Sequence, residues 1–271
     1  MTELKAQGSR LKAQGSRKGV LCLGLCALCL VPWLAGAQGG RGAGPALSPW
    51  ASAPLDLTGY WVAVVSEDWR WRMVTPAKGD YASIPLTQAG KDLADTWDPA
   101  KDVAAGEACK SYGAPGLMRA PTRLHITWQE DDTLRVATDY GTQTRTLHFT
   151  ASEAAGEPSL QGRSIAEWVR APAGRGANAA PPPPFGAGSL KVVTTSLRPG
   201  YLRKNGVPYS GDTVLTEYWD SFDAPNGDRW LVITTVVRDP RHLQTDWITS
   251  LHFRREPTGA KWKPSPCSAE W

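Results

Sequence analysis

Three histidines and one glutamate have the side chains best suited to proton transfer in this chain. They are Glu217, His125, His148 and His252. Each lies in a segment that reads as a strand, and Leu215 and Trp219 flank the glutamate on its own face. If the four side chains converge inside a barrel, they can act as general acid and base or hold a metal. The alternative places the histidines on a solvent face. No H-x-H or H-E-x-x-H spacing is present, so we predict no metal site.

The segment from Arg198 to Ser210 combines cationic and phenolic side chains with fixed turns. Its sequence, RPGYLRKNGVPYS, interleaves Arg198 and Arg203 with Tyr201, among glycines and prolines. Loops held by a rigid β scaffold are where binding residues concentrate. Such groups can clamp a carboxylate, a phosphate or a phenolic ligand. The alternative is a solvated hairpin whose basic residues keep a strand edge soluble.

Tryptophan is unusually abundant, with 13 residues in the chain, 12 of them after residue 37. A surplus of indole rings indicates either a heavily aromatic core or an aromatic-lined pocket. We predict a pocket with aromatic walls and a few polar groups at its mouth, the usual make-up of small-molecule sites. The predicted ligand-binding residues are Trp61, Trp69, Trp71, Trp128, Trp168 and Tyr218 for the walls, and Arg198, Tyr201 and Arg203 for the mouth.

Motifs of nucleophilic and nucleotide chemistry are absent from the sequence. There is no G-x-S-x-G elbow, no phosphate-binding loop and no dinucleotide fingerprint. A serine-triad hydrolase and a nucleotide-dependent enzyme therefore fit poorly, and we expect no cofactor.

Residues 1–37 read as a secretory signal peptide. Basic residues precede an apolar run from Val20 to Leu34, which ends at a typical cleavage sequence, Ala35-Gly36-Ala37. The run is shorter than the roughly 20 residues that cross a membrane, so we expect no stable membrane insertion after cleavage. Without this leader, the 30 basic and 26 acidic residues become 25 of each. The mature chain is neutral, so we expect no nucleic acid partner.

Two cysteines remain after the leader, Cys109 and Cys267. One disulfide is the expected state of such a pair in an oxidising compartment. A metal pair or a nucleophile is the functional alternative. We predict a Cys109–Cys267 bridge and a periplasmic or secreted location.

The elements that must position these residues are mainly strands. Segments rich in β-branched and aromatic residues alternate with short turns. They predict nine strands at residues 55–65, 123–129, 133–139, 143–150, 162–170, 189–197, 213–220, 229–238 and 247–255. A hairpin turn is marked by Pro225-Asn226-Gly227-Asp228. Nine strands with short turns predict an antiparallel meander closed into a barrel, with a β-sandwich as the alternative.

Other segments interrupt the strands. Residues 86–112 form the predicted helical insertion, with Thr87 as its N-cap. Residues 67–73, EDWRWRM, alternate aromatic and basic side chains and read as a strand end.

We predict a single barrel-like domain over residues 55–271. Residues 38–54 have little to bury, so we expect a disordered lead-in. Residues 171–188 are rich in proline and glycine and read as a loop insertion within the domain.

Parts of the sequence resemble two known groups of proteins. Gly59-x-Trp61 at the start of the first strand resembles the G-x-W signature of lipocalins and related calycin barrels. In that family the Trp packs across the closed end of a barrel whose open end holds a small hydrophobic ligand; the helical insertion departs from that pattern. Three blocks resemble a family of uncharacterised secreted bacterial proteins, from which no catalytic residue carries over. The blocks are LTQAGKDLADTWDPAKD at 86–102, SLRPGYLRKNGVPYS at 196–210 and TEYWD at 216–220.

The sequence therefore predicts a secreted binding protein for a small hydrophobic or aromatic molecule, built on a lipocalin-like barrel. One alternative is a barrel enzyme of the isomerase, cyclase or lyase type, with Glu217 and a histidine in proton transfer. Another is a cell-envelope interaction protein that uses the proline-rich loop.

Overall fold

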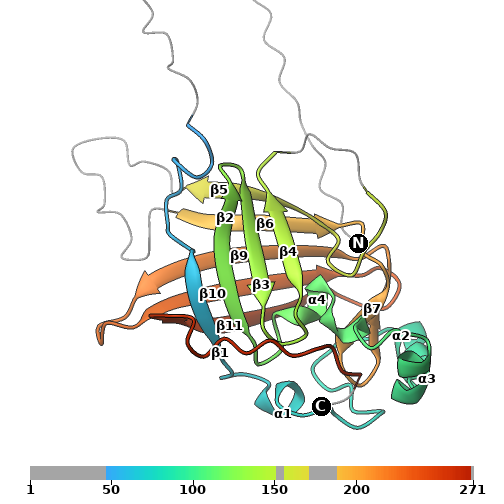
Figure 1. Ribbon diagram of the computed structural model, residues 1–271. Coiled ribbons are helices and arrows are strands. Elements are labelled where there is room, and N and C mark those ends of the chain that lie inside the picture. The colour runs from blue at the N-terminus through green and yellow to red at the C-terminus, as the bar shows by residue number, and fades with distance from the viewer. Residues whose placement is uncertain (1–46, 151–155, 171–187, 270–271) are drawn as a thin grey trace, which may run out of the picture. The chain divides into compact units, whose positions relative to one another are not determined.

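Nine strands close into a barrel in the order β1-β11-β10-β9-β6-β5-β4-β3-β2 (Figure 1). The computed structural model describes residues 47–150, 156–170 and 188–269, so the predicted signal peptide lies outside the described residues. The closed barrel confirms the mainly β fold and excludes the sandwich. Its strands are β1 (Gly59–Val64), β2 (Arg123–Glu130), β3 (Thr133–Thr138), β4 (Thr144–His148), β5 (Arg163–Arg170), β6 (Gly188–Thr195), β9 (Val214–Asp223), β10 (Arg229–Arg238) and β11 (Trp247–Glu256).

One pair of neighbouring strands in the barrel is parallel. β4 and β5 pair through Leu147–Ser164 and His148–Ile165, whereas the other neighbours are antiparallel. An odd number of strands cannot alternate direction all the way round a closed ring, so at least one pair must be parallel. The meander prediction is therefore right except at this seam, where the ladder is also short.

Short helices and a separate hairpin accompany the barrel. The helices are α1 (Trp69–Arg72), α2 (Gln88–Ala94), α3 (Pro99–Ala104), the 3-10 helix η1 (Lys110–Tyr112) and α4 (Ala114–Leu117); the hairpin pairs β7 (Gly200–Arg203) with β8 (Val207–Tyr209). Thr87 caps α2 by accepting a hydrogen bond from the Gly90 N–H at 3.1 Å. The helical insertion over 86–112 is therefore confirmed. No helix among the described residues is long and apolar enough to cross a membrane.

The expected strand end at residues 67–73 is wrong, because residues 69–72 form α1. Arg72 is buried and its Nη1 lies 2.6 Å from Glu67 Oε1. A strand would place two residues five positions apart at about 16 Å, too far for this pair. Asp68 begins the helix at φ 50 and its carboxylate pairs with Arg119 at 2.8 Å. The buried ion pairs thus decide the local backbone.

Apolar side chains fill the interior of the barrel. Trp61 is fully buried there and donates from Nε1 to the Leu57 carbonyl at 2.9 Å, while the Arg255 guanidinium lies 5.7 Å from the centre of its ring. Gly59 has φ 108, and a Cβ there would approach Arg255 Nη2 at 3.2 Å. The core includes Trp61, Leu124, Ile126, Leu190, Val192, Trp219, Leu231, Ile233, Leu251 and Phe253.

A second apolar cluster joins the hairpin and the helical insertion to the barrel. It contains Leu86 before α2, Leu202 and Val207 from the hairpin, and Val237 and Trp247 from the barrel. Burial of these side chains ties β7 and β8 to the ends of β10 and β11. The cluster fixes the position of the predicted binding segment against the scaffold.

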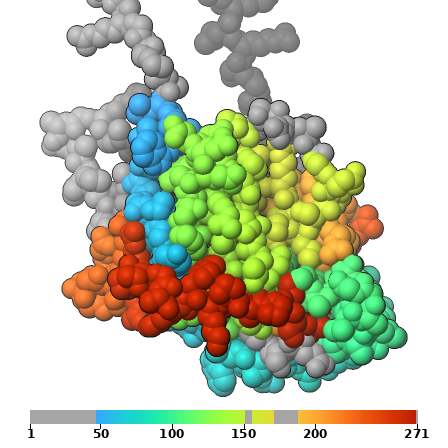
Figure 2. Space-filling view, in the orientation of Figure 1, coloured from blue at the N-terminus to red at the C-terminus, as the bar shows by residue number. Residues whose placement is uncertain are grey.

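The C-terminal segment after β11 lies across the outside of the barrel (Figure 2). Ser265 N–H donates to the Asp139 carbonyl at 2.8 Å, and Trp262 packs edge-on against Tyr60 with ring centres 5.9 Å apart. The segment ends at the predicted disulfide, Cys109–Cys267, with Cα atoms 5.1 Å apart. The bridge is confirmed.

Part of the segment expected to be disordered contacts the barrel. Within residues 38–54, only 47–54 are described. The Trp50 N–H donates to the Asp131 carbonyl at 2.9 Å, and Trp168 Nε1 donates to the Pro49 carbonyl at 2.9 Å. These hydrogen bonds to the backbone hold residues 47–54 against the barrel, although the side chains of Leu47 and Trp50 stay exposed. Of the predicted loop insertion at 171–188, only Gly188 is described, as the first residue of β6.

Candidate ligand-binding site

The predicted aromatic wall residues lie in several separate places. Trp61 is inside the barrel core. Trp128 and Trp168 are partly buried beside Phe149. The ring centres of the two tryptophans are 6.5 Å apart. The ring centre of Phe149 lies 5.5 Å from that of Trp128 and 5.1 Å from that of Trp168. This aromatic cluster packs against the barrel core. It covers the interior rather than lining an open space.

The remaining predicted wall residues lie outside the barrel. Trp69 is 67% exposed on α1, and Tyr218 is exposed on β9. Trp71 is held on α1 by a hydrogen bond from Nε1 to Asp80 at 3.0 Å, with Arg70 over its ring. The six wall residues therefore do not line one common pocket in the described structure.

Glu217 faces the barrel interior, as its apolar neighbours predicted, and forms an ion pair there. Its Oε1 and Oε2 lie 3.0 and 2.5 Å from Nη1 and Nη2 of Arg145, and both side chains are almost fully buried. The Thr194 hydroxyl accepts a further hydrogen bond from Arg145 at 3.2 Å. Sequence reasoning missed Arg145, although it shares the inward face of β4 with Leu147.

The three candidate histidines lie away from Glu217. His125 stacks on Tyr60 with ring centres 4.1 Å apart, and burial, with Arg135 nearby, lowers its pKa. His252 contacts Ser66 at 2.9 Å through Nδ1. His148 lines a groove on the barrel surface. Glu217 points inward, so the structure does not assemble the four into an acid–base site. In the described part of the chain, no group of three or more His, Cys, Asp or Glu side chains is placed to hold a metal ion.

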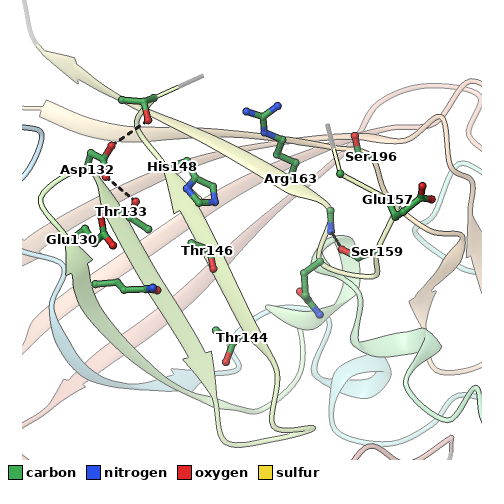
Figure 3. A pocket seen from close by; sticks show the side chains of 15 residues that line it. Glu130, Asp132, Thr133, Thr144, Thr146, His148, Glu157, Ser159, Arg163 and Ser196 are labelled. Atoms are coloured by element: carbon green, nitrogen blue, oxygen red, sulfur yellow. Dashed lines mark hydrogen bonds between the residues drawn. The ribbon is translucent and has the colours of Figure 1, made fainter. Parts of the chain in front are cut away.

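The groove that contains His148 lies beside the parallel seam. It has a volume of about 840 Å³, and Thr144, Thr146 and His148 lie in a row along β4, across from Arg163 and Ser159 (Figure 3). Apart from two glycines and His148, the described residues that line it carry hydroxyl, amide and charged groups. Its chemistry does not fit an apolar ligand.

A second groove, which we call the hairpin groove, is formed largely by the segment predicted to bind. Its volume is about 420 Å³. The walls come from α2, η1, the β7–β8 hairpin with the residues that follow it, and the connection from β10 to β11. They include Leu93, Lys110, Pro199, Tyr201, Pro208, Tyr209, Ser210, Asp212, Arg241 and His242.

Tyr201 is fixed on one side of the hairpin groove. Its hydroxyl donates to Asp102 Oδ2 at 2.9 Å, and Lys110 Nζ lies 2.7 Å from the other oxygen of the same carboxylate. The ammonium of Lys110 also lies 5.6 Å from the centre of the Tyr201 ring. Burial and the hydrogen bond to Asp102 raise the pKa of Tyr201, so the phenol stays neutral at physiological pH. The ring is therefore held in place before any ligand arrives.

Two glycines allow Tyr209 to pack beneath the groove. A Cβ at Gly113 or Gly200 would lie within 3 Å of the Tyr209 hydroxyl oxygen. That hydroxyl is buried without a hydrogen-bond partner among the described residues, and burial raises the pKa of Tyr209. No signal in the sequence separated this buried tyrosine from Tyr201.

Backbone contacts hold α2 against the connection from β10 to β11. Thr87 N–H donates to the His242 carbonyl at 2.9 Å, and Gln244 N–H donates to the Pro85 carbonyl at 2.8 Å. A Cβ at Gly90 would lie 2.7 Å from the His242 carbonyl oxygen, so glycine permits the close approach. These contacts join two walls of the hairpin groove to each other.

Asp239 ties these walls to the start of β9. Its carboxylate accepts hydrogen bonds from Ser210 N–H at 2.6 Å, from the hydroxyls of Ser210 and Thr213, and from the N–H groups of Arg241 and His242. Burial favours the neutral acid, but the hydrogen bonds from Ser210 and Arg241 outweigh it and lower the pKa of Asp239. The charged carboxylate thus holds together the segments at residues 210–213 and 241–242, which lie at the groove.

We expect Asp239→Asn to lower the free energy of unfolding by about 2–3 kcal/mol at pH 7, since hydrogen bonds to a charged group contribute roughly 1.5–3 kcal/mol. The pKa of Asp239 is lower in the folded chain than the unfolded value near 3.8, so its contribution is complete above that value. The contribution is lost as the pH falls through the folded pKa. Urea unfolding from pH 7 down to pH 2 should show the gap between wild type and variant closing in acid.

The matched control is Asp246→Asn, which alters a partly exposed carboxylate paired with the exposed Arg238 and should change the unfolding midpoint little. A difference for Asp239→Asn that stays constant across the pH range would contradict the role assigned to its charge.

The two predicted arginines of the mouth point elsewhere. Arg198 pairs with Glu107 at 2.8 Å, and Arg203 is buried on the other side of β7 against Trp71. Of the three predicted mouth residues, only Tyr201 lines the hairpin groove. Leu93, Arg241 and His242 were not predicted, because they come from segments far from the hairpin in sequence.

The lining of the hairpin groove combines apolar and basic side chains. Leu93, Pro199, Tyr201 and Pro208 supply apolar surface. The basic lining residues Lys110, Arg241 and His242 lie beside the carboxylates of Asp102, Asp212 and Asp239. Such a surface can hold an apolar body and an acidic group at once. Comparison of the chain with protein-family models, with curated protein sequences and with solved structures finds no match.

Proposed function

We propose that this protein is exported and binds a small molecule with an aromatic or aliphatic body and a carboxylate, in the hairpin groove. The observation that carries the proposal is the combination of apolar walls with basic residues in a groove of about 420 Å³. The leader-like first 37 residues and the Cys109–Cys267 disulfide support an oxidising compartment.

The size of the groove suits one small molecule. Small-molecule sites usually measure about 300–1,000 Å³ and bury most of the ligand surface against apolar side chains. Here the tyrosine ring and the two prolines are stiff, so little conformational entropy is lost when a ligand packs on them. The ion pair that holds Lys110 at Asp102 also fixes its ammonium beside the ring.

The barrel supports this role as a scaffold. Its interior contains the apolar core and the Arg145–Glu217 pair, and the strand ends carry the loops that line the groove. Rigid scaffolds with binding residues on their connections are a common arrangement.

Tyr201→Ala should weaken binding of the best aromatic or aliphatic carboxylate about fivefold or more, because it removes an apolar wall of the groove, and truncating an aromatic hot-spot residue costs more than about 1 kcal/mol. The panel would pair each carboxylate with its neutral amide, and saturation-transfer NMR followed by calorimetry would measure the affinities. We expect the carboxylates to bind more tightly than the amides, since Lys110, Arg241 and His242 line the groove.

Tyr218→Ala is the matched control, because that tyrosine is exposed on the outer face of β9. It should leave the affinity unchanged. The proposal is wrong if no member of the panel binds, or if Tyr201→Ala and Tyr218→Ala bind the same compound equally well.

A further inference from the structure

Three arginines that are far apart in the sequence meet outside the hairpin groove. Arg72 belongs to α1, Arg119 follows α4 and Arg203 ends β7, and none of the three is more than 5% exposed. All three line one small cavity with a volume of about 30 Å³. We call these residues the arginine cluster.

The N–H donors of the arginine cluster outnumber the acceptor atoms that lie around them. Arg72 donates from Nε to the Arg119 carbonyl at 2.8 Å, and Arg203 donates from Nη2 to the Ser83 hydroxyl at 2.8 Å. Four of its nitrogens are buried without a hydrogen-bond partner among the described residues: Arg72 Nη2, Arg119 Nη1, Arg203 Nε and Arg203 Nη1. A buried donor left unpaired costs roughly 1–3 kcal/mol, and more when it is charged. All three arginines lie around one cavity.

The charges of the arginine cluster are also not balanced. Its three positive charges face Glu67, which pairs with Arg72, and Asp68, which pairs with Arg119. A further carboxylate, Asp80, is engaged by the exposed Arg70 and by Trp71. One positive charge of the cluster therefore lacks a direct counter-charge among the described residues, and a buried uncompensated charge is costly.

An aromatic ring lies beside two of the three guanidinium groups. The Arg203 guanidinium carbon lies 5.0 Å from the centre of the Trp71 ring, and that of Arg119 lies 4.8 Å from the centre of the Trp247 ring. One ring lies beside each of these two groups, and their N–H bonds, which lie in the guanidinium plane, are what an anion can contact. Burial, with Arg119 nearby, lowers the pKa of Arg203 to about 10, which leaves it charged at neutral pH.

We propose that the arginine cluster is a binding site for one small monovalent anion, such as chloride, nitrate or formate. The anion would accept hydrogen bonds from the four unpaired nitrogens and neutralise the excess positive charge. Charge-assisted hydrogen bonds of this kind are among the strongest in proteins. A cavity needs about 10–15 Å³ to hold one water, so about 30 Å³ admits an ion of this size. This site is separate from the proposed function, and its anion would fasten α1, the segment after α4 and β7 together.

A crystal grown with bromide tests the site directly, because bromide replaces chloride and scatters anomalously. We expect an anomalous peak in the cavity, within hydrogen-bond distance of the unpaired nitrogens of Arg203 and at least one other arginine of the cluster. An ordered cavity that holds only water, or bromide confined to the outer surface, would overturn the proposal. This test needs no variant.

A solution test measures the thermal midpoint while sodium chloride replaces sodium gluconate at constant ionic strength. A ligand that binds the folded state raises the midpoint with its concentration. We expect Arg203→Gln to weaken chloride binding roughly tenfold to a hundredfold, the effect of losing charge-assisted hydrogen bonds. Arg238→Gln is the matched control, because Arg238 lies exposed on β10 beside Asp246. Equal chloride dependence in the two variants would refute the site, and the bromide crystal decides the question if Arg203→Gln does not fold.

Discussion

Arg145→Met should lower the free energy of unfolding by about 3–5 kcal/mol, one of the largest effects expected for a single substitution in the barrel. The substitution leaves the Glu217 carboxylate inside an apolar core, where its exposed fraction is 0%. Removing one partner of a buried ion pair commonly costs this much, because the other charge remains without compensation. Urea unfolding at pH 7, followed by circular dichroism, measures the change.

The double variant Arg145→Met with Glu217→Leu should recover most of that loss. Replacing both partners by apolar groups removes the desolvation cost of two charges, and such exchanges are often close to neutral. The Thr194 hydroxyl loses its contact with Arg145 but keeps one with Ser164 at 2.8 Å. If the double variant is as unstable as the sum of the single variants, the pair is not coupled and the account fails.

An exposed pair on the same barrel provides the control. Lys191 and Glu167 lie 2.7 Å apart on β6 and β5, where solvent screens the interaction. Breaking this pair by Lys191→Met should change the unfolding midpoint little. The contrast isolates burial as the cause of the large effect at Arg145.

Much of the barrel was predictable because inward-facing apolar residues alternate with outward-facing residues along its strands. In β9, Leu215, Glu217 and Trp219 face inward while Thr216 and Tyr218 face outward, as period-two patterning requires. The nine predicted strands correspond to the nine of the barrel within a few residues at most boundaries. The parallel seam also follows from that count, since an odd ring must contain one parallel pair.

The same alternating pattern led to a wrong prediction for the short segment at residues 67–73. Trp69 and Trp71 alternate with arginines, but over four residues an alternating pattern does not distinguish a strand from one helical turn. The ion pairs of Glu67 with Arg72 and of Asp68 with Arg119 fit the helical turn. Arg119 lies 51 residues from Asp68, so the local sequence does not reveal that partner.

The sequence analysis selected the segment that forms a wall of the candidate site, but not most of the side chains that line it. The segment 198–210 does form a groove wall, yet Arg203 and Lys204 are buried rather than solvated. Their burial depends on aromatic rings from other segments, such as Tyr112 under the Lys204 ammonium at 4.8 Å. By contrast, Arg145 was within reach of sequence reasoning, since an inward arginine on one strand and an inward glutamate on another predict a pair.

Cys109→Ser together with Cys267→Ser should lower the free energy of unfolding by about 3–5 kcal/mol. The bridge closes a loop whose ends are 158 residues apart, and in the chain-entropy model such a long loop gives a stabilisation near the upper end of the usual range. The effect arises in the unfolded chain, which gains freedom when the bridge is absent. Urea unfolding of the double variant and of the oxidised wild type measures the difference.

The folded structure of that variant separates two explanations. The C-terminal segment keeps other contacts, including Ser265 N–H to the Asp139 carbonyl and Trp262 against Tyr60 and His125. If the bridge acts on the unfolded chain, these contacts persist, and limited proteolysis under native conditions should cut the segment no faster than in wild type. Rapid native-state cleavage between residues 257 and 266 would mean instead that the disulfide holds the segment onto the barrel. The loss of stability would then belong to released native contacts and not to loop entropy.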